Sequence, residues 1–323
     1  MMNLKLIPKI ELHVHLDGSA RPDTVADILD MNLDDVKRQM IAPYKCKDLN
    51  DYLDKFSLPI KAMQTRENLE RIAYEVATDI KNDGCIYAEI RFAPLKHITT
   101  GMSLYNVIES VLRGLDRVDL KTNLILCMMR DAKVQENMQV IDFAKHYLNN
   151  GVCAVDLAGA ESIYETKDFA ELFEYAESVG VPFTIHAGEA AGIDSISSAI
   201  SFHTNRIGHG IRIIEDDKII NEVINKNILL EICPTSNIQT NVITDFENHP
   251  IKKLHDMGVK ISINTDNRTV SNTTLTREYQ LLESKLGFTE EDFVKINRQS
   301  IEFAFLSEDE KKKLRNKFNS LVI

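Results

Sequence analysis

Four short segments of this chain carry side chains of the kinds that bind divalent metals. They are His13-Val-His15, His186-Ala-Gly-Glu189, Gly208-His209-Gly210 and Thr265-Asp266-Asn267. Each segment lies at the end of a short apolar run of the kind that forms a β-strand. Residues two apart in a strand point to the same face, so both imidazoles of the first segment face the same way. The pattern predicts one site that collects these side chains.

The residue types indicate which metal the site would hold. The candidate ligands are His13, His15, His186 and Asp266. Three neutral imidazoles and one carboxylate suit zinc and leave a coordination position open for water. Zinc lowers the pKa of such a water to about 7, which makes hydroxide available at neutral pH. We therefore expect one Zn²⁺ per chain and hydrolytic chemistry.

Two further side chains near these ligands could transfer protons. Glu189 follows His186 by three residues. A flat substrate that seals the pocket would desolvate Glu189 and raise its pKa, which keeps it protonated as a general acid requires. The alternative is a purely structural carboxyl group. His209, between two glycines that allow close approach, could act as a base or as a cation; a fifth metal ligand and a core histidine are the alternatives.

The remaining histidines lack partners at motif spacing, and we expect surface or structural roles for them. They are His97, His146, His203, His249 and His255.

Eight apolar runs rich in branched residues predict the strands that position these groups. They span 10–16, 86–92, 124–129, 152–157, 182–186, 206–208, 228–233 and 260–264. Helical patterns lie between most of them, for example at 68–81, 103–117, 169–179 and 250–257. Continuous apolar strands that alternate with helices indicate a parallel sheet, and eight such units fit a (β/α)₈ barrel.

The predicted fold is therefore an α/β barrel of the TIM type that forms one domain over residues 1–323. The stretch 22–81 is too long for one crossover and predicts extra helices after the first strand. Residues 286–323 predict a helical C-terminus, with Thr289 and Asp292 as a capping box. An open doubly wound sheet is the alternative, but no G-x-G-x-x-G turn follows the first strand.

Composition limits the partners. A net charge of −11 argues against a nucleic-acid surface and favours a small, uncharged substrate. Five scattered cysteines without a C-x-x-C pair indicate a reducing compartment. No apolar stretch resembles a signal peptide or a membrane span, so we expect a cytoplasmic protein without a membrane partner. We also expect a monomer or a weak homo-oligomer.

Six segments in this order resemble those of the adenosine deaminase family, and the resemblance spans residues 10–267. They are ELHVHLDG at 11–18, DLAG at 156–159, TIHAGE at 184–189, RIGHG at 206–210, EICPTSN at 231–237 and SINTD at 262–266. The resemblance implies a (β/α)₈ barrel with one zinc. It also implies hydrolytic deamination of adenosine, and of 2′-deoxyadenosine, to inosine or deoxyinosine and ammonia in purine salvage.

The same resemblance assigns roles to residues of this chain. His13, His15, His186 and Asp266 would hold the metal. Glu189 would protonate purine N1. His209 would orient the attacking hydroxide or take its proton, and Asp266 could share that proton. The substrate would be bound by His15, Asp17 at a ribose hydroxyl, Gly159 at N3 and Asn267 at N7.

Two features bear on the choice of substrate within the family. Relatives that act on adenine or aminofutalosine tend to carry Glu in place of Asp17, so a nucleoside is favoured and those 6-aminopurines are the alternative. An AMP-specific relative is expected to have extra phosphate-binding basic residues, which are not evident here. Many members have Asp where this chain has Asn267. An Asn amide can donate to N7 without carrying a titratable proton.

Other classes of protein fit the sequence less well. A binuclear amidohydrolase would need a modified lysine on the fourth strand, and residues 152–159 contain no lysine. The cytidine-deaminase type needs a Pro-Cys-x-x-Cys zinc site, which is absent. A barrel kept only for binding would lack a ligand or Glu189. On the second strand, Glu89 and Arg91 share a face and predict an inward ion pair with each other.

Overall fold

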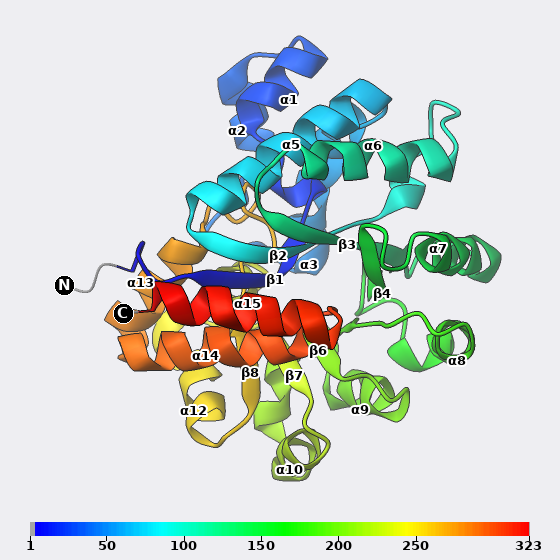
Figure 1. Cartoon of the computed structure of the whole chain (residues 1–323). Coiled ribbons are helices and arrows are strands. Elements are labelled where there is room, and N and C mark those ends of the chain that lie inside the picture. The colour runs from blue at the N-terminus through cyan, green and yellow to red at the C-terminus, as the bar shows by residue number, and fades with distance from the viewer. Residues whose placement is uncertain (1–3, 323) are drawn as a thin grey trace.

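Eight parallel strands alternate with helices in this computed structural model, which describes residues 4–322 (Figure 1). The strands are β1 (Lys9–His15), β2 (Cys85–Phe92), β3 (Lys121–Met129), β4 (Val152–Ala158), β5 (Ile185–Ala187), β6 (Arg206–His209), β7 (Leu229–Ile232) and β8 (Lys260–Ile263). They pair in chain order within two four-stranded sheets, β1–β4 and β5–β8. Each of the eight overlaps a predicted apolar run.

Backbone hydrogen bonds across both seams join the two sheets into a ring. Between β4 and β5, the Val155 amide donates to the Pro182 carbonyl at 3.0 Å. Between β8 and β1, the Asp266 amide donates to His13 O at 2.9 Å, and the His15 amide donates to Asp266 O at 2.6 Å. The predicted barrel is therefore confirmed, and the alternative of an open sheet is wrong.

Extra helices follow β1, and helices cover the outside of the ring in chain order (Figure 1). The first group is α1 (Pro22–Leu29), α2 (Leu33–Met40), α3 (Leu49–Leu53), α4 (Ser57–Ala62) and α5 (Arg66–Asn82). Around the ring come α6 (Leu104–Asp116), α7 (Val134–His146), α8 (Ala170–Ser178), α9 (Ile193–Ser201), α10 (Asp217–Asn225), α11 (Pro234–Gln239) and α12 (Ile251–Asp256). The chain ends with α13 (Leu275–Leu286), α14 (Glu290–Phe303) and α15 (Glu308–Leu321).

Helices α14 and α15 lie side by side and cover the amino ends of the strands (Figure 1). Asn297 of α14 accepts a hydrogen bond from the Ile10 amide at 2.8 Å, and Phe318 of α15 belongs to the same buried cluster as Leu12 of β1. The predicted capping box begins α14, with the Asp292 amide donating to Thr289 Oγ1 at 3.2 Å. This end of the barrel is closed, so the carboxyl ends of the strands are left for a site. No helix in residues 4–322 is long and apolar enough to cross a membrane.

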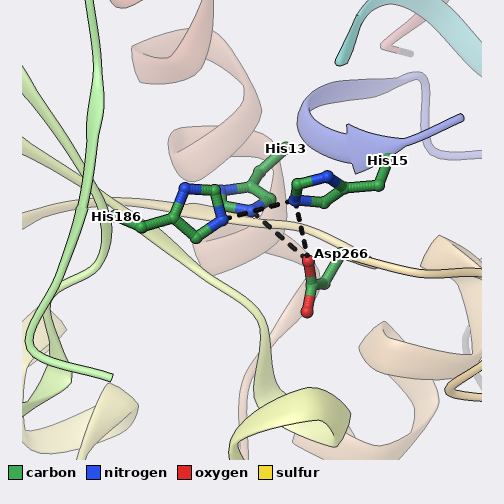
Figure 2. Close-up of side chains that lie close together, drawn as sticks. All are labelled: His13, His15, His186 and Asp266. Atoms are coloured by element: carbon green, nitrogen blue, oxygen red, sulfur yellow. Dashed lines mark hydrogen bonds and ion pairs between the residues drawn. The ribbon is translucent and has the colours of Figure 1, made fainter. Parts of the chain in front are cut away.

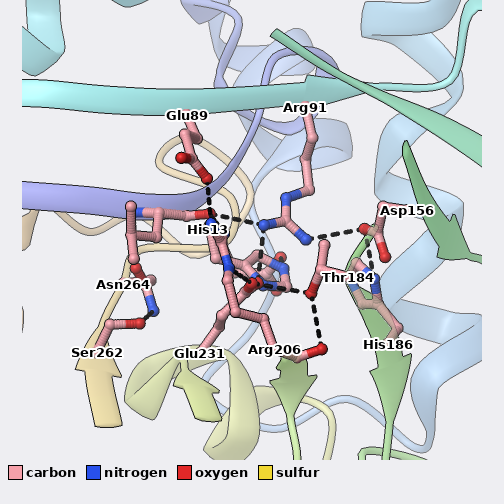
Figure 3. A network of polar contacts seen from close by, with 12 residues as sticks. His13, Glu89, Arg91, Asp156, Thr184, His186, Arg206, Glu231, Ser262 and Asn264 are labelled. Atoms are coloured by element: carbon pink, nitrogen blue, oxygen red, sulfur yellow. Dashed lines mark hydrogen bonds and ion pairs between the residues drawn. The ribbon is translucent and has the colours of Figure 1, made fainter. Parts of the chain in front are cut away.

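The barrel interior holds charged side chains whose pairing differs from the prediction. Glu89 does not pair with Arg91: its Oε2 accepts from Arg206 Nη1 at 2.5 Å, while Arg91 donates to Asp156 and Glu231, both at 2.8 Å (Figure 3). All five groups are fully buried. The prediction failed because the side chains of residues two apart on one strand point into the barrel in parallel and not toward each other. Arg206, in contrast, reaches Glu89 from the opposite side of the ring. Partners from other strands therefore compensate each buried charge.

We expect Arg206→Met to lower the free energy of unfolding by about 3–5 kcal/mol, because it leaves buried carboxylates without a counter-charge. Arg206 bonds to Glu89 and, at 2.7 Å, to Glu231. Urea unfolding followed by circular dichroism measures the change. Arg113→Met is the control, since Arg113 pairs with Glu70 at the surface and its loss should cost less than about 1 kcal/mol. Similar losses in both variants would contradict this account of the interior.

Candidate active site

The four candidate ligands come together at the carboxyl ends of the strands (Figure 2). Asp266 Oδ1 lies 3.4 Å from Nε2 of both His13 and His15, and His15 Nε2 lies 3.3 Å from His186 Nε2. One ligand atom from each residue lies within 4.8 Å of every other. Ligands placed tetrahedrally at zinc bond lengths are about 3.4 Å apart, so the spacing suits one zinc-sized cation.

The backbone explains why residues so distant in sequence meet. His13 and His15 share one face of β1, and His186 lies on β5. Asp266, three residues past β8, is bonded through its amide and carbonyl to β1 and adopts a left-handed φ of 57°. Such a conformation is strained for a residue other than glycine and is characteristic of functional sites. The seam that closes the barrel thus sets Asp266 beside both imidazoles of β1.

Buried carboxylates orient two of the imidazoles from behind (Figure 3). His13 Nδ1 bonds to Glu231 Oε2 at 2.8 Å, and His186 Nδ1 lies 2.8 Å from Asp156 Oδ2. A proton held on each Nδ1 leaves the lone pair of Nε2 directed at the site, as metal-binding histidines require. Arg91 holds both carboxylates, so one guanidinium fixes the orientation of two candidate ligands.

The site also fits a cation electrostatically. Burial lowers the pKa of His15 well below its ordinary value, which keeps this imidazole neutral and able to coordinate. His13 Nε2 is buried without a hydrogen-bond partner, and the Nε2 atoms of His15 and His186 point at each other. A positive ion between these atoms would satisfy all three lone pairs.

One cysteine, Cys233, lies close to the candidate metal ligands. Its sulfur belongs to a second group that could hold an ion, together with His13, His209 and Asp266. Burial raises the pKa of this thiol well above its ordinary value, and its Sγ donates to the Glu231 carbonyl at 3.6 Å. A protonated thiol is a poor ligand, so the set of three imidazoles and Asp266 remains the better one.

Glu189 is positioned by a second glutamate that the sequence interpretation missed. Glu161, from the loop after β4, accepts hydrogen bonds from the amides of Gly188 at 2.7 Å and Glu189 at 3.0 Å. It also accepts from the amides of Ala190 at 2.7 Å and Ala191 at 3.0 Å. Burial, with the nearby charges of Asp266 and Glu161, raises the pKa of Glu189 well above its ordinary value. This shift favours the protonated form that a general acid requires.

A chain of hydrogen bonds selects the tautomer of His209. The Ile251 amide donates to His249 Nδ1 at 3.2 Å, so neutral His249 carries its proton on Nε2. That nitrogen lies 3.4 Å from Asn237 Oδ1, and Asn237 Nδ2 lies 3.1 Å from His209 Nδ1. Burial lowers the pKa of His209 well below its ordinary value. A neutral His209 therefore carries its proton on Nε2, which lies 3.6 Å from Glu189 Oε2.

A cavity of about 280 Å³ opens in front of these groups. Its lining includes every expected substrate contact: His15, Asp17, Gly159 and Asn267. Gly159 has a φ of +108°, which few other residues adopt, and burial raises the pKa of Asp17 to about 6. Apolar side chains from the extra helices cover one side: Leu49, Tyr52, Leu53, Phe56 and Ile60. The five histidines predicted to be structural, all within the described residues, do not line this cavity.

Asn267 lies between the cavity and the Tyr52 hydroxyl. Its Nδ2 donates to Tyr52 Oη at 3.0 Å, and its Oδ1 is buried without a partner. A Cβ at Gly18 would lie 1.8 Å from Oδ1, so glycine at that position makes room for the amide. Because one N–H of the amide is used by Tyr52, the second N–H remains for a ligand.

Fold and site together define a class of protein. A parallel barrel that collects imidazoles and carboxylates at the carboxyl ends of its strands is the arrangement of a metal-dependent hydrolase. A family model described as "Adenosine deaminase" matches residues 8–321. Adenosine deaminase of Clostridium perfringens is 41% identical over 97% of this chain and 98% of its own length. That of Vibrio atlanticus is 40% identical over 97% and 98%.

This chain belongs to the adenosine deaminase family and is a hydrolytic deaminase. Solved structures agree. Arabidopsis ADAL complexed with IMP is 26% identical, with a TM-score of 0.90 over 99% of this chain and 98% of that one. An amidohydrolase from Burkholderia ambifaria with bound Zn is 22% identical, with a TM-score of 0.88 over 98% and 92%, which shows the shared fold.

Proposed function

We propose that the protein deaminates adenosine, and 2′-deoxyadenosine, to inosine or deoxyinosine and ammonia with one zinc ion per chain, in purine salvage. The convergence of His13, His15, His186 and Asp266 in front of a protonated Glu189 carries this proposal. Relatives named adenosine deaminase at about 40% identity support the nucleoside as substrate.

His13, His15, His186 and Asp266 hold the metal, with Glu231 and Asp156 keeping two of the imidazoles in the coordinating tautomer. A divalent metal at such a site acidifies water and so provides a nucleophile at neutral pH.

Glu189 donates its proton to purine N1, and the ring carbon C6 becomes electrophilic. Its raised pKa keeps that proton available, and the four amides bound by Glu161 hold the turn that carries it. The oxygen of a water-derived hydroxide adds to C6. The proton that it releases reaches the 6-amino group, and the tetrahedral adduct then expels that group as ammonia. Protonating N1 stabilises the negative charge that would otherwise develop on the ring.

His209 orients the attacking oxygen rather than taking its proton. The hydrogen-bond chain from the Ile251 amide leaves a proton on His209 Nε2, which can donate to that oxygen. Asp266 is the ionised group beside it that can accept the released proton. Although burial opposes it, the neighbouring imidazoles of His13, His15 and His209 hold the pKa of Asp266 well below its ordinary range.

The purine and ribose are held by groups that line the cavity. Gly159 offers its amide to N3, and Asn267 offers its second N–H to N7. Asp17 accepts from a ribose hydroxyl, with His15 packed beside it.

The five cysteines are all unpaired and buried, which supports a reducing compartment such as the cytoplasm.

Product analysis on three substrates tests the proposal. Zinc-loaded protein is incubated with adenosine, adenine or AMP, and ammonia and the purine product are measured. We expect inosine from adenosine with the highest kcat/KM. Turnover of adenine but not adenosine would overturn the nucleoside assignment and favour the alternative of an adenine-type deaminase.

The Asn267→Asp variant tests the proposed contact at N7. An aspartate can donate to N7 only when protonated, whereas the Asn amide donates at every pH. We expect KM of the parent for adenosine to stay flat as pH rises and KM of the variant to increase. KM measured across the neutral and alkaline range checks this, with Asn248→Asp as a surface control. Equal or tighter binding by the Asp form at alkaline pH would contradict the contact.

A further inference from the structure

One ammonium group, that of Lys96, lines the cavity, and its positive charge is paired with the carboxylate of Asp131. Among the described residues, Lys96 is the single lysine or arginine in the cavity lining, which also contains the carboxyl groups of Asp17, Asp131, Glu189 and Asp266. Lys96 follows β2 in the 3₁₀ turn Pro94–His97, and Asp131 follows β3. The adjacent strands bring Lys96 Nζ within 2.7 Å of Asp131 Oδ2.

This pair lies at the mouth of the cavity. The side chain of Lys96 is 34% exposed and that of Asp131 is 47% exposed, whereas Asp266 at the floor is 5% exposed. The proposed chemistry places the purine C6 at the floor, beside the candidate metal ligands and Glu189. The ribose is at the opposite end of a nucleoside from C6, so its 5′ carbon would lie nearer the mouth, the end of the cavity that holds this pair.

We propose that the Lys96–Asp131 ion pair selects a 5′-hydroxyl nucleoside over its 5′-phosphate. The inference rests on the proposed function, because it uses the same orientation of substrate. Asp131 forms an ion pair with the Lys96 ammonium group that a phosphate would need for binding. The negative charge of Asp131 also repels a phosphate dianion. A 5′-hydroxyl carries no charge and is not affected by this repulsion.

The pair also refines the expectation that basic residues for phosphate are absent. A lysine is present at the correct end of the cavity, but its charge is taken by Asp131. Selection against a nucleotide therefore depends on one carboxylate, and a single substitution should relax it.

The test compares kcat/KM for adenosine and AMP in zinc-loaded parent and Asp131→Asn proteins, together with the inhibition constant of AMP against adenosine. We expect the parent to favour adenosine. In Asp131→Asn we expect kcat/KM for AMP to rise about tenfold and AMP to compete more tightly, because one repelling charge is removed and Lys96 is released. Turnover of adenosine should stay within about twofold, since the variant changes only a rim charge.

Three controls separate the causes. Adding Lys96→Gln to Asp131→Asn should abolish the gain for AMP. The gain should shrink between about 0.01 M and about 0.15 M salt, as the Debye length falls from about 30 Å to about 8 Å. Asp256→Asn removes the carboxylate of a second Lys–Asp pair, in which Lys252 is 29% exposed and Asp256 is 56% exposed and neither residue lines the cavity. In this variant the ratio of kcat/KM for AMP to kcat/KM for adenosine should not change.

The outcomes distinguish the two proposals. A parent that does not turn over adenosine overturns the proposed function. A parent that deaminates adenosine but shows the same AMP-to-adenosine ratio as Asp131→Asn, in both turnover and competition, overturns the role of the ion pair alone.

Discussion

Glu189→Gln is expected to retain its metal and lose about 10²–10⁴-fold in kcat on adenosine, the contribution typical of a general acid. The amide keeps the shape of the protonated carboxyl group and its four-amide support from Glu161, but it cannot transfer a proton to N1. Steady-state kinetics and metal analysis of the same preparation measure both quantities. Because burial and neighbouring charges raise the pKa of Glu189, the parent should stay active through neutral pH. Its kcat should fall only as rising pH removes this proton.

Glu278→Gln is the matched control for this substitution. Glu278 is also fully buried, and burial raises its pKa to about 7, but it does not line the cavity. It accepts from the Thr235 amide at 3.1 Å, and Gln keeps an oxygen for that bond. We expect most of the activity to remain. Undiminished activity in Glu189→Gln would show that this residue is not the acid.

His186→Ala is expected to weaken metal binding by more than about 100-fold and to abolish turnover at stoichiometric metal. Loss of a group that only supports a ligand already costs about 10–100-fold, and removal of a ligand should cost more. Isothermal titration of metal-free protein with zinc measures the affinity. His255→Ala serves as the control, since His255 pairs with Asp292 away from the cavity. Equal zinc affinity in both variants would exclude His186 from the metal site.

The strands could be predicted because buried parallel strands are continuous apolar runs. Agreement is close at the seventh, predicted at 228–233 and found at Leu229–Ile232. It is poorer at the fifth, predicted at 182–186 and found at Ile185–Ala187. The earlier residues lie at the seam between the two sheets, where Phe183 makes only an isolated bridge to Val155. A run of apolar residues indicates that a segment is buried. It does not show whether an adjacent strand continues to form backbone hydrogen bonds with that segment.

Site residues could be predicted where they lie together at the end of one strand. They could not be predicted where the residues that position them come from distant parts of the sequence. His13 and His15 are two residues apart, and the alternation of side chains along a strand is enough to place them on a common face. No local pattern connects Glu161 with the turn at Glu189, or Glu89 with Arg206. Those contacts depend on how loops and strands far apart in sequence meet. Buried acidic residues inside apolar strands, such as Asp156 and Glu231, were the one available signal of supporting groups.

We propose that one metal held by His13, His15, His186 and Asp266 supports deamination of a nucleoside. Metal-free protein titrated with zinc, with inosine formation from adenosine as the readout, tests this proposal. We predict no activity without metal, and a linear rise that reaches its plateau at one equivalent of zinc per chain. Full activity in the metal-free protein, or a plateau only at two equivalents, would contradict it.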